Sequence, residues 1–137
     1  MALTHHTAPW TPIGSYTGPV RYPGLIVDTA YYKDMSPSAV IAMRDYANGY
    51  FTKDTLEARI QPAINVANAH HVQLYCGEYG VYPKIPEDIA LHYYSDLCGI
   101  FRKNGIAYCH WCYKGDFPVV NSDGTPKQKL VSILTAH

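Results

Sequence analysis

Val72–Gly80, with the sequence VQLYCGEYG, is the stretch on which the interpretation of the whole chain depends. Residues 72–78 form a short apolar run between turn-type residues, too short for a stable helix, so we predict a buried strand. Strand side chains alternate, so Cys76 and Glu78 should share one face with the other even-numbered residues, while Tyr75 points the other way. A carboxylate that ends an apolar face is costly unless it is paired or reactive. Glu78 is therefore either a partner in a structural ion pair or a functional residue.

A second short apolar run, GIAYCHW at Gly105–Trp111, predicts a second strand. A helix over residues 86–104 separates the two strands, so they form a βαβ unit and should be parallel neighbours with a right-handed crossover. The expected inward face of this pair consists of Cys76, Glu78, Cys109 and Trp111. Function in such units lies at the carboxyl ends of the strands, which is where Glu78 and Trp111 are placed.

Two segments, CGEYGVY at 76–82 and YCHWCYKGDFPVVNSDGTP at 108–126, resemble the last two strands of glycoside hydrolase family 5. This is the cellulase and endoglucanase family, with an eight-stranded β/α barrel. In the family, the Glu of a Gly-Glu-Phe or Gly-Glu-Tyr motif ends strand seven and is the nucleophile, and a Trp ending strand eight stacks on sugar. The resemblance implies that Glu78 is the catalytic nucleophile and Trp111 the sugar-stacking platform. The segments LTHHTAPW at 3–10 and VRYPG at 20–24 resemble the stretch after strand six and its loop.

Further substrate-binding residues are expected around the same barrel mouth, because sugar rings stack on aromatic planes and hydrogen-bond to polar groups there. They are Tyr79 and Tyr82 after the nucleophile, Lys114 and Asp116 after the platform, and Trp10 with His5 or His6 in the substrate-side loop. A solvated surface lysine and a plain loop acid are the competing interpretations of Lys114 and Asp116.

The other half of the family's machinery is missing from the sequence. A retaining glycosidase needs two carboxyl groups about 5–5.5 Å apart, and the family's acid/base belongs to an Asn-Glu dipeptide, which this sequence lacks. The family's His-x-Tyr motif is also absent. The chain has 137 residues, whereas a complete barrel needs about 250. We therefore predict an α/β fold, about half of a TIM-type β/α barrel, as one domain over 1–137 with a loop-rich opening segment over 1–35.

Two functions fit this half-barrel. One is retaining hydrolysis of a β-1,4-glucan-type polysaccharide; the other is non-catalytic carbohydrate binding. Half a barrel has two unpaired strand edges and an exposed apolar inner face, so we expect either a homo-oligomer, a symmetric dimer first, or a missing barrel half as partner. Two copies that each supply four strands would place a second Glu78 near the position of the missing acid.

The remaining elements follow from local signals. Ser36 and Pro37 start a predicted helix that Asn48-Gly49 ends, and Leu25–Val27 is a possible short strand. A capping box of Asp54 and Glu57 is predicted to start a helix that runs to Ala69. The last helix is expected to begin at Thr125 and Pro126.

A metal or redox protein is the competing class, because Cys109 and Cys112 have CxxC spacing. On a strand these two side chains would face opposite sides, and the pair does not begin a helix, where the dipole would lower a thiol pKa. We therefore predict no metal and no cofactor, and four free buried cysteines.

Composition excludes several classes. A hydrophobic share of 47%, a charged share of 16% and a net charge of zero argue against a disordered chain and against nucleic-acid binding. No apolar run reaches the roughly eighteen residues of a membrane span, and MALTHHTAPW has no signal-peptide pattern. Secretion is expected only from the family resemblance.

Overall fold

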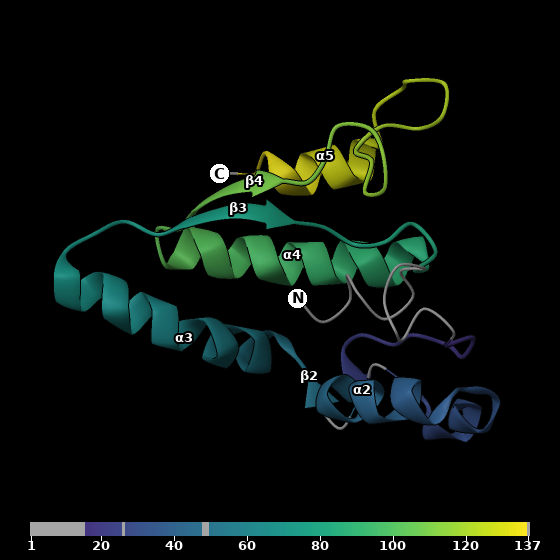
Figure 1. Cartoon of the computed structure of the whole chain (residues 1–137). Coiled ribbons are helices and arrows are strands. Elements are labelled where there is room, and N and C mark those ends of the chain that lie inside the picture. Colours follow the sequence, from purple (N-terminus) through teal and green to yellow (C-terminus); the bar gives the residue numbers. More distant parts are fainter. Residues whose placement is uncertain (1–15, 26, 48–49, 137) are drawn as a thin grey trace.

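The computed structural model describes residues 16–25, 27–47 and 50–136, without the side chains of residues 45–47. The chain is a mixed α/β protein, as predicted (Figure 1). Its elements in order are β1 (Gly24–Leu25), the 3-10 helix η1 (Thr29–Asp34), α2 (Pro37–Ala47), β2 (Tyr50–Phe51), α3 (Lys53–His70), β3 (Tyr75–Tyr79), α4 (Glu87–Lys103), β4 (Ala107–His110) and α5 (Gln128–Leu134). None of the helices in these ranges is both long enough and apolar enough to cross a membrane.

The β3–α4–β4 unit is the centre of the fold. β3 and β4 pair in parallel, which confirms the prediction, and Figure 1 shows them side by side along α4. The buried residues of α4 are Tyr93, Tyr94, Leu97, Cys98, Ile100 and Phe101. The helix ends at Asn104, as expected, and Gly105 follows with φ 62°, a left-handed conformation that favours glycine. α4 also packs against α3 and α5.

A β-bulge in β3 changes the expected alternation. Cys76 pairs with Tyr108 and Tyr79 with His110, so Gly77 and Glu78 together oppose a single residue of β4. Cys76 and Tyr79 consequently both face the helices, and Cys76 packs against the core. The prediction that Cys76 shares the inward face with Glu78 is therefore wrong, because strict alternation does not hold across a bulge.

The face of the sheet turned away from α4 is open to solvent. Tyr75 is 66% and Trp111 50% exposed, and Glu78 and Cys109 are exposed as well. Tyr108, the residue before Cys109, points the other way, and its ring centre lies 5.2 Å from that of Phe101 in α4. Three of the four residues predicted for the inward face therefore lie on the open side. This side would be the interior of a β/α barrel.

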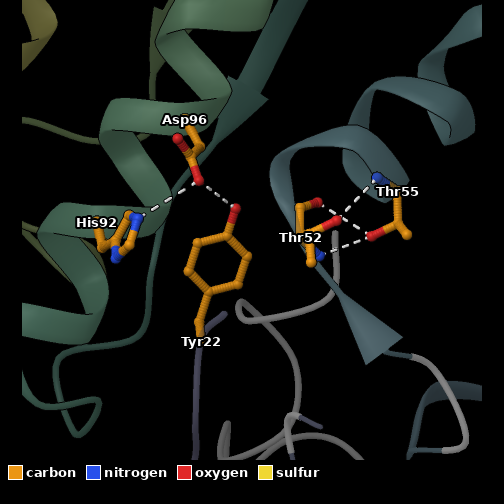
Figure 2. Close-up of polar contacts among 5 residues, drawn as sticks. All are labelled: Tyr22, Thr52, Thr55, His92 and Asp96. Atoms are coloured by element: carbon orange, nitrogen blue, oxygen red, sulfur yellow. Dashed lines mark hydrogen bonds and ion pairs between the residues drawn. The ribbon is translucent and has the colours of Figure 1, made fainter. Parts of the chain in front are cut away.

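The opening segment carries more structure than predicted. β1 pairs antiparallel with β2, Gly24 opposite Phe51, so the strand expected at Leu25–Val27 begins one residue earlier and has a partner that we did not predict. Tyr22 anchors the segment to α4, because its hydroxyl donates to Asp96 Oδ2 at 2.7 Å (Figure 2). Burial, followed by the Asp96 carboxylate, raises the pKa of Tyr22.

Two of the four predicted helix starts agree with the structure, those of α2 and of α4, which follows its N-cap Pro86. Ser36 Oγ accepts the Ala39 N–H at 3.3 Å and caps α2, as expected. α3 is capped by Thr52, whose backbone N–H donates to Thr55 Oγ1 at 2.7 Å while its own side chain accepts the Thr55 N–H (Figure 2). The predicted box of Asp54 and Glu57 is thus wrong.

The carboxylate of Glu57 instead joins α3 to the end of α4. It accepts from Lys103 Nζ at 2.9 Å and from Asn104 Nδ2 at 3.0 Å. These two bonds, that of Asn104 first, lower the pKa of Glu57.

The last helix, α5, begins at Gln128 without a side-chain cap, later than predicted. Thr125 does not cap it, because its N–H and its hydroxyl both donate to Asp123 Oδ1, at 2.9 and 2.6 Å, within the preceding turn. The expected packing face is confirmed: Leu130 is buried, and Ile133 and Leu134 pack against the core.

Candidate functional site

Glu78 and Trp111 lie at the same end of the two parallel strands. Glu78 is the penultimate residue of β3, and Trp111 directly follows β4. The Trp111 N–H donates to the Tyr79 carbonyl at 2.9 Å, so pairing continues past the end of β4. Both side chains are exposed. The strand ends thus present one carboxylate and one indole beside each other.

Glu78 takes part in no ion pair or side-chain hydrogen bond within the residues that the structure describes. Its backbone carbonyl lies 3.5 Å from Cys76 Sγ. An exposed carboxylate without a fixed partner can approach a ligand directly. The structural ion-pair interpretation therefore has no support in this part of the chain.

Gly80 lets the chain after Glu78 pass close to Trp111. A Cβ atom at Gly80 would lie 2.6 Å from the Trp111 carbonyl oxygen and 3.1 Å from Phe117 Cβ, and the first distance is too short for any other residue. The prediction from sequence did not single out this glycine. Its place two residues after the carboxylate is the only signal that pointed to it.

The loop after β4 is held by its own backbone. The Trp111–Cys112 peptide bond is cis, the Cys112 N–H donates to the Phe117 carbonyl at 2.9 Å, and the Val119 N–H donates to the Cys112 carbonyl at 3.2 Å. Lys114 and Asp116 are exposed in the turn between them, and Lys114 Nζ lies 5.8 Å from the centre of the Tyr113 ring. These two predicted site residues are therefore in the loop that follows Trp111.

Tyr79 and Tyr82 lie elsewhere than expected. Tyr79 is only 5% exposed, and its ring makes edge contacts with Tyr94, Phe101, Tyr108 and His110, so it belongs to the core. The bulge turns it toward the helices and away from the open face. Tyr82 is half-buried, 6.2 Å from the Phe117 ring, and lines a pocket of about 360 Å³ between the loop after β3 and α5. Trp10, His5 and His6 lie outside the described residues.

A buried hydrogen-bond chain stands behind the strand ends. The Val81 N–H donates to Tyr94 Oη at 2.7 Å, and the same hydroxyl lies 3.0 Å from His110 Nε2. Burial, and then the positive charge of Lys127, lower the pKa of His110 to about 4, so the imidazole is neutral at neutral pH. Neither Tyr94 nor His110 was predicted to matter, since nothing in their spacing brings them together.

The CxxC pair does not form a metal site in the described part of the chain. Cys109 is exposed on the open face, and Cys112 Sγ donates to the Lys114 carbonyl at 2.7 Å. No group of three or more His, Cys, Asp or Glu residues in the described ranges could hold a metal ion. All four cysteines are free, but only Cys98 is buried; Cys76 and Cys112 are half-buried and Cys109 is exposed.

The proteins of known identity that the chain matches in sequence are endoglucanases. The chain is 29% identical over 135 residues to endoglucanase C of Acetivibrio thermocellus, covering 96% of this chain and 39% of that protein. The figures are the same for endoglucanase C307 of Clostridium sp. strain F1. The chain thus spans about two fifths of the length of the curated relatives it matches.

Solved structures agree on the fold. A glycoside hydrolase aligns with a TM-score of 0.70 and 22% identity over 98% of this chain and 38% of its own. Thermotoga maritima Cel5A, solved with mannotriose, aligns with a TM-score of 0.68 and 16% identity over 97% and 35%. No family model matches the chain. The resemblance to family 5 is nevertheless confirmed, because the chain is homologous to endoglucanase C and structurally similar to family 5 cellulases.

Proposed function

We propose that this chain forms the nucleophile-bearing part of a glycoside hydrolase that cleaves β-1,4-glucan, with Glu78 as nucleophile and Trp111 as sugar-stacking platform. The observation that carries the proposal is the exposure of both side chains on the open side of two adjacent parallel strands, joined by the Trp111 N–H bond to the Tyr79 carbonyl. The endoglucanase relatives support a polysaccharide substrate.

The chemistry assigned to Glu78 is that of a retaining enzyme. A carboxylate oxygen attacks the anomeric carbon, the leaving oxygen takes a proton from a second carboxyl group, and water then hydrolyses the glycosyl-enzyme ester. Trp111 would hold a sugar ring by stacking on its apolar face. The second carboxyl group must come from outside the motifs present here, since the sequence has no Asn-Glu dipeptide.

The remaining strands of a β/α barrel would then extend this sheet from its edges and enclose its open face. Among the described strands, β3 pairs only with β4. Next to β3 lies an apolar groove of about 410 Å³, whose lining includes Leu56 and Ile60 from α3 and Leu74 from the approach to β3. A groove between a helix and the edge of β3 that has no partner among the described strands suits a further strand. Those strands would come from a longer chain or from a second copy.

The test is hydrolysis of a soluble β-1,4-glucan by the protein and by Glu78→Gln. The amide cannot form the glycosyl-enzyme ester, so turnover should fall below detection while oligosaccharide binding stays within about twofold. Glu87→Gln is the matched control, because this exposed carboxylate lies in the first turn of α4, 3.7 Å from Lys129 Nζ. Undiminished hydrolysis by Glu78→Gln would place the nucleophile elsewhere.

Carbohydrate binding without catalysis is the second candidate, favoured by the missing acid/base motif. It predicts that the unmodified chain binds cello-oligosaccharides but releases no reducing ends from glucan. Reducing ends that disappear with Glu78→Gln would exclude it.

A further inference from the structure

The hydroxyl of Tyr94 connects the two chain segments that carry the candidate site, the one that continues from β3 and the end of β4. It binds the N–H of Val81, three residues after Glu78, and Nε2 of His110, the residue before Trp111. We propose that Tyr94 is a positioning residue that fixes Glu78 and Trp111 relative to each other. This inference rests on the proposed function for the roles of those two residues, and it adds a residue of α4 to the site.

The donors available decide how the Tyr94 hydroxyl bonds to Val81 and leave its own proton for His110. A tyrosine hydroxyl has one proton, and a backbone N–H can only donate. Tyr94 Oη therefore accepts from Val81, and its own proton is available to His110 Nε2 in the tautomer that leaves this nitrogen unprotonated. The pKa of about 4 for His110 is consistent with this neutral state. The single buried hydroxyl of Tyr94 is thus hydrogen-bonded to both chain segments, at Val81 N–H and at His110 Nε2.

The backbone around Val81 and His110 is in close contact with the backbone that carries Glu78 and Trp111. The Gly80 backbone approaches the Trp111 carbonyl too closely for a Cβ atom at Gly80, and the Trp111 N–H is bonded to the Tyr79 carbonyl. The Tyr79 ring also packs against Tyr94, with ring centres 6.1 Å apart. A shift of Val81 or His110 must therefore move the backbone that carries Glu78 or Trp111.

The adjacent residue offers a matched control. Tyr93 lies in the same turn of α4 and is 1% exposed, but its hydroxyl has no hydrogen-bond partner within the described part of the chain. Tyr94→Phe and Tyr93→Phe each remove one buried hydroxyl from the core. Only Tyr94→Phe breaks the hydrogen bonds that join the two chain segments. Packing effects common to both variants therefore cancel in the comparison.

The experiment uses the full chain and two readouts besides activity. The indole N–H resonance of Trp111 is followed by NMR, with Trp10→Phe identifying it among the two tryptophans. The side-chain nitrogen shifts of His110 are followed in parallel. Affinity for cellotetraose is measured by calorimetry on the same samples.

We expect Tyr94→Phe to shift both sets of resonances and to weaken binding about tenfold or more, the range known for groups that orient a ligand-binding residue. Tyr93→Phe should leave all of them unchanged.

A merely structural role for Tyr94 would lower the melting temperature and shift only the His110 resonances, whose direct partner is removed, while the Trp111 indole resonance and the affinity of the folded protein stay as they were; that result overturns the inference. If Tyr94→Phe does not fold, His110→Gln, which keeps an acceptor, is compared with His110→Leu, which does not. Affinity retained in the first and lost in the second supports the inference, and equal affinities overturn it. Resonance shifts in a protein that binds no cellotetraose would support the positioning role and count against the proposed function.

Discussion

At the scale of single residues, the candidate site depends on which side of a strand each side chain takes. Glu78 and Trp111 are exposed on the open side, whereas Tyr79, between them in the hydrogen-bond pattern, is buried against α4. The bulge at Gly77 and Glu78 produces this division. A carboxylate and an indole exposed on the same side suit the cleavage of a sugar polymer, which needs both a nucleophile and a stacking surface.

Trp111→Ala tests the stacking role. Loss of an aromatic platform should weaken oligosaccharide binding by about 1–3 kcal/mol, by analogy with other stacking sites. Tyr50→Ala is the control, since Tyr50 is 64% exposed but belongs to β2 in the other sheet. The measurement is calorimetric titration with cellotetraose. Equal affinities for the two variants would remove Trp111 from the binding surface.

At the scale of elements, the sequence predicted which helices and strands exist better than how they begin. The βαβ unit followed from two short apolar runs around a helix, and its parallel pairing is confirmed. The start of α3 was misplaced, because Asp54 and Glu57 fit a capping box as well as Thr52 and Thr55 do. Tertiary contact decides between them: Glu57 is engaged by Lys103 and Asn104 from α4, which no local pattern reveals.

The residues behind the site show the same limit. Glu78 and Trp111 were predicted as site residues because each ends an apolar run, a signal carried by neighbouring residues in the sequence. The hydrogen bond between Tyr94 and His110 was not predicted, because it joins a helix to a strand 16 positions away. The bulge was equally invisible, since the alternation of residues 72–78 gives no sign of an extra residue. Only the register with β4 reveals it.

Thr52→Ala tests the observed start of α3. Loss of the cap and of its bond with Thr55 should lower the free energy of unfolding by about 0.5–2 kcal/mol. Asp54→Ala, at the predicted cap, should change it by less, since Asp54 lies inside the first turn and is exposed. Urea unfolding of both variants gives the comparison. A larger loss for Asp54→Ala than for Thr52→Ala would contradict the assignment.

At the scale of the whole molecule, the open face of the β3–β4 sheet is the feature that remains to be explained. The shared-glutamate dimer expected from sequence needs four barrel strands from each copy. In the described residues, β1 and β2 instead form a separate antiparallel pair, which leaves two parallel strands. Two copies of this part therefore do not supply an eight-stranded parallel barrel. Tyr75 and Trp111, two large apolar side chains exposed on the same face of the sheet, still favour a partner, because exposed apolar surface can mark an interaction site.

The solution mass tests whether that partner is a second copy. We expect sedimentation at micromolar concentration to give a mass above the 15.3 kDa of one chain. Tyr75→Glu should return it to one chain, because a buried interface would have to desolvate the new carboxylate. Tyr50→Glu should not, although Tyr50 at 64% is as exposed as Tyr75 at 66%, because β2 lies outside the open sheet. A monodisperse mass of one chain for the unmodified protein would argue against self-association. The open face would then be left to a barrel half of different sequence, which would also have to supply the second carboxyl group.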